Sequence, residues 1–215
     1  SALIKEIRRR ASRYGVFNVY FRQSTVYIEP AGIACDTEGM YEEAKRIFGI
    51  VAVNRAAVCE KSMDSILRVA EEYLPKRLSD VRTFKVDARR SDKRFPLTSP
   101  EISATLGGRL LSLMPHLRVD VHNPEVVVTV EVRDEHAYIR AGQESGAGGL
   151  PIRTSGRGLL LLSGGIDSPV AGLMMAKRGM EIEALHFESF PYTSERAREK
   201  VMTLAEKMCA YASRI

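Results

Sequence analysis

A glycine-rich loop between a strand and a helix carries the residue types that best suit a chemical role. The segment Leu159–Gly172 reads LLLLSGGIDSPVAG. Gly164 and Gly165 permit backbone conformations closed to other residues and let a ligand approach the main chain. Ser163 and Ser168 add hydroxyl groups, and successive N–H groups in such a loop face one point. The pattern therefore predicts a cradle for a phosphate or another anion.

The residues after the loop predict a helix whose first turn favours the same ligand. Ser168 is a good N-cap, and Pro169 fits the first helical position because its missing N–H would be unpaired there anyway. The helix is expected to end at Gly179, with the basic residues Lys177 and Arg178 in its last turn. Its positive dipole end would point into the loop and strengthen anion binding.

Two familiar phosphate loops are excluded by spacing. The motif G-x-x-x-x-G-K-[ST] needs a lysine that Gly164–Ser168 does not offer, and a G-x-G-x-x-G turn is also absent. A tight turn without a ligand is the simple alternative, because Gly and Ser are common in turns. However, the string S-G-G-x-D-S resembles the signature of the ATP pyrophosphatase family, or PP-loop family. The resemblance implies that the loop holds the β- and γ-phosphates of ATP as a leaving pyrophosphate.

The chemistry implied by this family takes place at the α-phosphorus. A substrate oxygen attacks that atom and becomes an adenylate, and AMP is then the leaving group. Asp167 is the candidate catalytic residue, acting through Mg²⁺ on the phosphates, since this ion prefers few carboxylates plus phosphate oxygens. An ordinary acidic residue of a loop or cap is the alternative, so no metal ligand is assigned with certainty.

The nucleoside is expected at the ends of two neighbouring strands, because ligands of doubly wound sheets lie outside the carboxyl ends of the strands. One strand ends at Leu161 and Leu162, and the next ends at His186 and Phe187. A histidine satisfied within the core is the alternative for His186. The candidate ATP-binding residues are Leu161, Leu162, Ser163, Gly164, Gly165, Asp167, Ser168, His186 and Phe187.

Residues 1–54 predict a small α+β unit. Apolar residues at helical spacing predict helices near residues 3–11 and 39–50. Residues 18–30 are interpreted as two short strands around a polar turn, and a third strand follows the second helix. This order is most of a split unit in which helices cover one face of an antiparallel sheet. The first strand of such a unit is missing.

The rest of the chain predicts two further regions. Residues 55–142 read as helix, strand, helix, strand, strand, a second α+β unit. Residues 143–157 are rich in Gly, Ser and Pro and are interpreted as a linker. From 158 to 215, continuous apolar strands alternate with helices, which is typical of a parallel, doubly wound sheet.

A basic segment, Arg82–Phe95, lies in the second unit. Its six basic and two acidic residues give a net charge of +4, against +5 for the whole chain. Such a concentration of charge favours a phosphate backbone as partner, although a solvated basic loop is an equal alternative on charge alone. The candidate RNA-binding residues are Lys85, Arg89, Arg90, Lys93 and Arg94.

Two longer resemblances decide between these alternatives. The segments FKVDARRSDKRFPLTSPEIS and VDVHNPEVVVTVEVRDEHAYI resemble a THUMP domain, an RNA-binding module of tRNA-modifying enzymes. The string GGLPIRTSGRGLLLLSGGIDSPVAGLMMAKRG, with HFESFPYTSERAREKV, resembles the tRNA 4-thiouridine synthetase (tRNA sulfurtransferase) family. This family implies a ferredoxin-like domain at 1–54, a THUMP domain at 55–142 and a PP-loop domain at 158–215.

The family also implies function and partners. The first two domains bind the tRNA acceptor region, and the third adenylates O4 of a uridine and exchanges that oxygen for sulfur from a cysteine desulfurase or another persulfide donor. Members also serve thiamine thiazole synthesis as sulfur carriers. A tRNA-binding module without activity and another adenylating PP-loop synthetase are the alternatives. The identity of the uridine and of the sulfur donor stays open.

Bulk properties set further limits. No apolar run approaches the roughly 20 residues of a membrane span and no signal-peptide pattern is present, so we expect a cytoplasmic protein without a membrane partner. Cys35, Cys59 and Cys209 are widely spaced and odd in number, which argues against disulfides and a zinc site. None is nominated as catalytic, because the family's persulfide-handling cysteine lies later in the PP-loop domain.

The length of the last region predicts a piece of a longer protein. Only 52 residues follow Ser163, fewer than the about 100 to 150 of a doubly wound domain. Together with the missing first strand, this suggests truncation at both ends, and a rhodanese domain after the PP-loop domain is left open. An unfinished sheet edge would also favour pairing with a second copy as a homodimer.

Overall fold

The computed structural model describes residues 1–22, 24–189, 192–212 and 215, which form two compact units. One unit joins Ser1–Val53 to Glu144–Ile215, and the other is Asn54–Gln143. No helix in the described part of the chain has the length and apolar content that a membrane crossing requires.

The N-terminal part of the first unit is a small α+β layer. An antiparallel hairpin packs against two helices through a core that includes Ile7, Val19, Met40 and Ile47. The order helix, strand, strand, helix, strand agrees with the sequence prediction. The elements are α1 (Ala2–Ala11), β1 (Phe17–Arg22), β2 (Thr25–Pro30), α2 (Thr37–Lys45) and β3 (Ala52–Val53).

The segment that the sequence marks as a linker is held by backbone hydrogen bonds. Its strand β9 (Glu144–Ser145) pairs antiparallel with β3. Further on, the N–H of Gly148 donates to the carbonyl oxygen of Ile50, and the N–H of Leu150 donates to the carbonyl oxygen of Lys177, each at 2.8 Å. The third strand, predicted after the second helix, is divided, because β3 pairs here whereas β4 (Ala57–Glu60) joins the sheet of the second unit.

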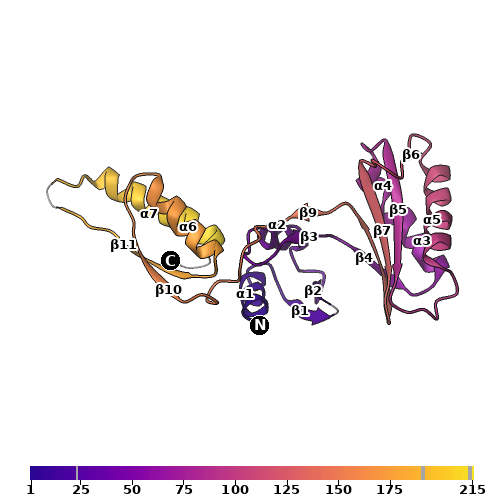
Figure 1. Ribbon diagram of the computed structural model, residues 1–215, viewed down its shortest axis with the longest axis horizontal. Helices are drawn as coiled ribbons and strands as arrows, with labels where there is room; N and C mark the ends of the chain where they lie inside the picture. The colour runs from indigo at the N-terminus through magenta and orange to yellow at the C-terminus, as the bar shows by residue number, and fades with distance from the viewer. Residues whose placement is uncertain (23, 190–191, 213–214) are drawn as a thin grey trace. The chain divides into compact units, whose positions relative to one another are not determined.

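The C-terminal part of the first unit is the start of a parallel α/β layer. Strands β10 (Arg157–Leu161) and β11 (Glu181–Leu185) pair in parallel. Helices α6 (Asp167–Lys177) and α7 (Glu195–Ala212) lie side by side against this strand pair (Figure 1). Leu160 and Ile182 contribute to the core, whereas alternate residues such as Leu159 point away from it and are exposed.

The second unit has a five-stranded mixed sheet in the order β4-β8-β7-β5-β6. Its strands β5 and β7 are parallel, whereas β7 and β8 are antiparallel. Helices α3 and α5 pack on the sheet face that carries Phe84, Val130 and Ile139. The remaining elements are α3 (Met63–Tyr73), α4 (Pro75–Leu78), β5 (Thr83–Arg90), α5 (Ser99–Leu113), β6 (Arg118–Val119), β7 (Val126–Val132) and β8 (His136–Ala141).

The predicted fold class is confirmed. Two α+β regions precede a parallel strand pair with its helices, and the three short elements α4, β6 and β9 were not predicted. The apolar alternation of the strands explains why the long elements could be located, since each strand has one covered face.

Candidate functional site

The glycine-rich loop connects the end of β10 to the start of α6 and closes on itself through two serines. The N–H of Ser163 donates to Ser168 Oγ at 3.0 Å, and the two hydroxyl oxygens lie 3.1 Å apart. The N–H of Gly165 donates to Ser163 Oγ at 3.4 Å. The hydroxyls therefore hold the loop in a tight curve in front of the helix.

Several amides of this loop remain available for a ligand. Within the described residues, no hydrogen bond occupies the N–H groups of Gly164, Ile166 or Asp167. They precede or open α6, where the first N–H groups of a helix have no partner in the helix itself. Amides and helix dipole together give the loop a positive potential, so it suits an anion such as phosphate.

The structure corrects the predicted start of α6. The helix begins at Asp167 with Ile166 at the N-cap position, so Ser168 is not the N-cap and Pro169 is not the first helical residue. The physical reason is that the Ser168 hydroxyl is engaged by the N–H of Ser163 across the loop. Pro169 still lies in the first turn, where its missing N–H removes no helix hydrogen bond. The predicted end is confirmed, since Gly179 follows the helix with a φ of +92°.

The ends of the two parallel strands meet beside the loop. The N–H of Leu162 donates to the carbonyl of Leu185 at 2.9 Å, and His186 Nδ1 lies 2.8 Å from the Leu162 carbonyl oxygen. Because a carbonyl only accepts, Nδ1 carries the proton, and Nε2 of the neutral ring is an acceptor. Nε2 is buried and has no partner among the described residues.

The nominated ATP residues thus fall into two groups. Leu162 is buried at 3% exposure and joins the strand end to His186. Leu161 and Phe187 are exposed, as is Asp167 at the start of α6. The structure brings together the loop, Leu162 and His186, while Leu161 and Phe187 present apolar surface to solvent.

One residue beside the loop was missed by the sequence interpretation. The side chain of Lys200, on α7, passes 3.9 Å from the position that a Cβ on Gly164 would occupy. Phosphate loops with an internal lysine carry the cation within the motif, whereas Lys200 comes from a later helix. A basic residue next to the buried Val201 in an amphipathic helix was the only sequence signal.

The basic segment of the second unit does not lie on one surface. Residues of β5 alternate, so Phe84, Ala88 and Arg90 lie on the face covered by helices, while Lys85 and Arg89 lie on the opposite face. Arg90 is half-buried and donates from Nη1 to the Phe95 carbonyl at 3.2 Å.

The loop after β5 carries the other two nominated cations, Lys93 and Arg94, both exposed. Arg94 Nε donates to Asp92 Oδ1 at 3.0 Å, and Lys61 Nζ donates to Asp92 Oδ2 at 2.8 Å. Asp92 is 7% exposed. Hydrogen bonds from Arg94 and then Lys61 hold the pKa of the Asp92 carboxyl well below its usual range. The carboxylate thus fixes the loop that presents Lys93.

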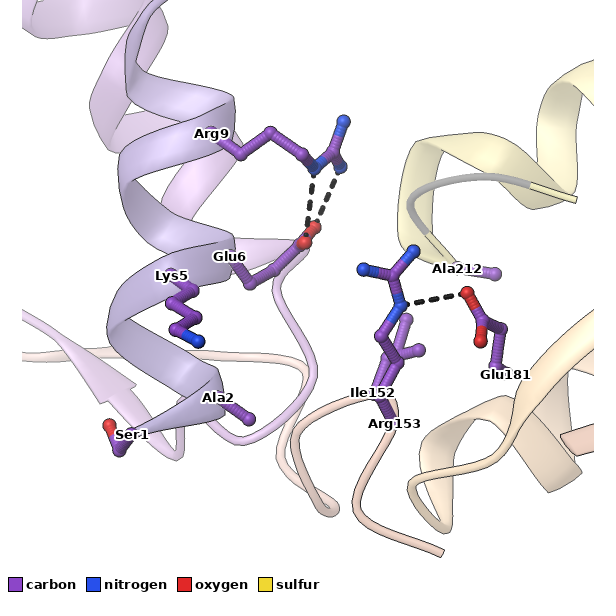
Figure 2. Close-up of a pocket in the computed structure, with 9 residues that line it drawn as sticks. All are labelled: Ser1, Ala2, Lys5, Glu6, Arg9, Ile152, Arg153, Glu181 and Ala212. Atoms are coloured by element: carbon purple, nitrogen blue, oxygen red, sulfur yellow. Dashed lines mark hydrogen bonds and ion pairs between the residues drawn. The ribbon is translucent and has the colours of Figure 1, made fainter. Parts of the chain in front are cut away.

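A cleft of about 450 Å³ lies elsewhere in the first unit, between α1 and the segment before β10 (Figure 2). Lys5, Arg9 and Arg153 line it. Arg9 pairs with Glu6 at 2.8 Å, and Arg153 pairs with Glu181 at 2.7 Å. Because carboxylates within the cleft offset these two cations, the loop is the better anion site.

The three cysteines lie far apart in the sequence and outside the glycine-rich loop. All three are free thiols, and no cluster of three His, Cys, Asp or Glu residues suited to a metal exists in the described part. Burial raises the pKa of the Cys59 thiol, which disfavours its reactive thiolate form.

Two protein-family models match parts of the chain. The THUMP domain model matches residues 60–140, and the model described as thiamine biosynthesis protein (ThiI) matches residues 153–215. Among curated proteins, the chain is 45% identical over 212 residues to a probable tRNA sulfurtransferase of Alkaliphilus oremlandii, covering 97% of this chain and 53% of the relative. It is also 50% identical over 177 residues to a probable tRNA sulfurtransferase of Moorella thermoacetica. This match covers 82% of this chain and 45% of the relative.

Solved structures show a similarity over nearly the whole of this chain. A crystal structure of a 4-thiouridine synthetase–RNA complex with bound ATP is 34% identical, with a TM-score of 0.88, and covers 98% of this chain and 53% of that one. A crystal structure of a protein from Pyrococcus horikoshii is 28% identical, with a TM-score of 0.83. The match covers 98% of this chain and 67% of that one. The chain spans about half the length of the curated relatives that it matches.

Proposed function

Because this chain belongs, over the part that it spans, to the tRNA sulfurtransferase family, we propose that it serves the ATP-dependent conversion of a tRNA uridine to 4-thiouridine. The observation that carries the proposal is the serine-closed loop with available amides at the start of α6, in a chain that also contains a THUMP region. Such a chain combines a phosphate site with an RNA-binding module.

The proposed reaction has two steps. The uracil O4 attacks the α-phosphorus of ATP, so that an O4–phosphorus bond forms and the bond to pyrophosphate breaks. In the second step, the outer sulfur of a persulfide adds to C4, and the C4–O4 bond breaks so that AMP leaves with the oxygen. A thiol then attacks the inner sulfur of the persulfide and forms a disulfide with it, which breaks the S–S bond and leaves the outer sulfur on C4. Adenylation is needed because a carbonyl oxygen is a poor leaving group, whereas AMP is a good one.

The loop's role is to hold the pyrophosphate portion of ATP. The N–H groups of Gly164, Ile166 and Asp167 donate to phosphate oxygens, and the serine hydroxyls keep them in place. The Asp167 side chain is exposed beside these amides, and its carboxylate has no hydrogen bond or ion pair within the described residues, so it would fit a Mg²⁺ ion that also binds phosphates. When bound, that ion neutralises charge on the leaving pyrophosphate.

The strand ends hold the nucleoside. Nε2 of His186, an acceptor without a partner, suits a donor such as a ribose hydroxyl or the adenine amino group. Leu161 and Phe187 offer exposed apolar surface for the adenine ring.

The second unit is proposed to bind tRNA. Its support is the THUMP match and a solved relative in complex with RNA. Lys93 and Arg94 on the loop after β5, with Lys85 and Arg89 on the open sheet face, are the proposed phosphate contacts. Arg90 would instead support the loop, because it bonds to the Phe95 carbonyl.

The family also suggests a sulfur donor and a second role, in thiamine synthesis. The persulfide donor would be a cysteine desulfurase or a similar sulfur carrier. The matched family description also supports a role in supplying sulfur for thiamine synthesis. Because the proposed substrate is tRNA, we place the activity in the cytoplasm.

The decisive experiment measures tRNA-dependent release of pyrophosphate from ATP by the intact protein. Asp167→Asn should reduce the rate by at least about 100-fold, the order expected when an electrostatic contribution to a transition state is removed. Binding of tRNA, measured by filter retention, should stay within twofold. If the variant still released pyrophosphate at the normal rate, the loop would not be the ATP site.

A further inference from the structure

Lys200 occupies a defined place next to the glycine-rich loop. Its neighbour Val201 is 4% exposed and belongs to the same buried cluster as Leu162 and Met208. Since Leu162 directly precedes the loop, this cluster fixes α7 against the end of β10. The position of Lys200 relative to the loop therefore follows from core packing.

The side chain of Lys200 passes close to the loop at Gly164. Its Cδ atom lies 3.9 Å from the position of a Cβ on Gly164, which is ordinary van der Waals contact. The ammonium group is two bonds further out, on an exposed residue. No hydrogen bond or ion pair within the described part of the chain engages that ammonium group.

We propose that Lys200 binds the β- and γ-phosphates of ATP and supplies the cation that the loop sequence lacks. The inference rests on the proposed function, because it assumes that the loop holds ATP. A lysine ammonium is a compact point charge and a common phosphate ligand. It reaches the loop from α7, so no lysine is needed inside the motif.

Its effect should grow during the reaction. As the bond between the α-phosphorus and pyrophosphate breaks, negative charge builds on the leaving group beside Lys200. A fixed cation at that point stabilises the transition state more than the bound substrate. Lys200 is thus a phosphate-binding residue with a further contribution to the adenylation rate.

Calorimetric titration of the intact protein with ATP, inorganic pyrophosphate and AMP tests the proposal. Lys200→Ala should weaken ATP and pyrophosphate binding roughly tenfold, the size expected for a charge-assisted hydrogen bond, and leave AMP binding unchanged. Lys200→Arg should restore most of the affinity for pyrophosphate. Lys207→Ala, the same charge change at an exposed site further along α7, is the matched control and should behave as the wild type.

The outcomes separate this inference from the proposed function. If the wild type binds neither ATP nor pyrophosphate, the proposed function fails. If the wild type binds both and Lys200→Ala binds them equally well, only the role of Lys200 is overturned. An equal loss with AMP, or an equal loss in Lys207→Ala, also overturns it, because the effect would then not depend on contact with the outer phosphates.

Discussion

At the scale of single residues, the position of the proton on the His186 ring determines which kind of ligand atom can hydrogen-bond at the strand ends. His186 donates from Nδ1 to the Leu162 carbonyl, which leaves Nε2 buried as an acceptor. A buried acceptor without a partner is costly. A ligand that donates a hydrogen bond at this point would remove that cost, so the ring favours a nucleoside over a free phosphate.

This orientation gives a prediction for His186→Asn. The amide can still donate to Leu162, but it does not reach the position of Nε2. ATP and AMP affinity should both fall, by roughly fivefold for one hydrogen bond of about 1 kcal/mol. Titration calorimetry of both nucleotides measures this, with pyrophosphate binding as the internal control. A loss limited to ATP would contradict a nucleoside contact.

Asp92 gives a prediction of pH dependence. Its carboxyl pKa lies below the ordinary value of 3.8 because Arg94 and Lys61 donate to the carboxylate. The ionised form is favoured in the folded state, so its stabilisation is present above the unfolded pKa and is lost as pH falls through the folded pKa. Asp92→Asn should flatten the decline of unfolding free energy below about pH 4, measured by urea titration at several pH values. Parallel curves for variant and wild type would argue against this contribution.

At the scale of elements, close approach of the segment before β10 to α6 requires a glycine. Gly149 has a φ of +75°, and an added Cβ would overlap the Lys177 carbonyl oxygen, which accepts a hydrogen bond from the N–H of Leu150. Gly148 also has a positive φ, +65°, but open space around it. The two neighbours therefore separate backbone strain from steric overlap.

Gly148→Ala should cost only the strain of a left-handed residue, about 1–2 kcal/mol. Gly149→Ala should cost about 1–3 kcal/mol more, because the backbone must also move away from Lys177. Chemical denaturation of both variants measures the difference in unfolding free energy. Equal values would show that α6 can shift without cost.

Much of the element order was predictable, because periodic apolar residues mark one covered face of each helix and strand. Apolar periodicity could not predict features that depend on a particular contact between side chains or between elements. Ser168 is not the N-cap because its hydroxyl is engaged by Ser163. Lys200 escaped notice because only packing of α7 brings it to Gly164. Arg90 looked equivalent to Arg89 until strand alternation placed it on the covered face.

At the scale of the first unit, a buried arginine ties its N-terminal and C-terminal parts together. Arg10, on α1, is 1% exposed and donates to Glu6 and Glu43 at 2.6 and 2.8 Å. It also donates to the carbonyls of Ala210 and Tyr211 at the end of α7, each at 2.7 Å. Its donors satisfy carboxylates of the α+β layer and the C-terminal carbonyls of the helix that carries Lys200.

Removing this side chain should therefore destabilise the unit strongly. Arg10→Ala leaves the Glu43 carboxylate, 5% exposed, without its buried partner, and the expected cost is about 3–5 kcal/mol. Arg9→Ala is the matched control, since Arg9 forms a more exposed pair with Glu6 whose loss should cost below about 1 kcal/mol. Urea unfolding of the intact proteins measures both. Arg10→Ala should also weaken ATP binding if α7 depends on this anchor, and a variant as stable as Arg9→Ala would show that core packing alone holds the two parts together.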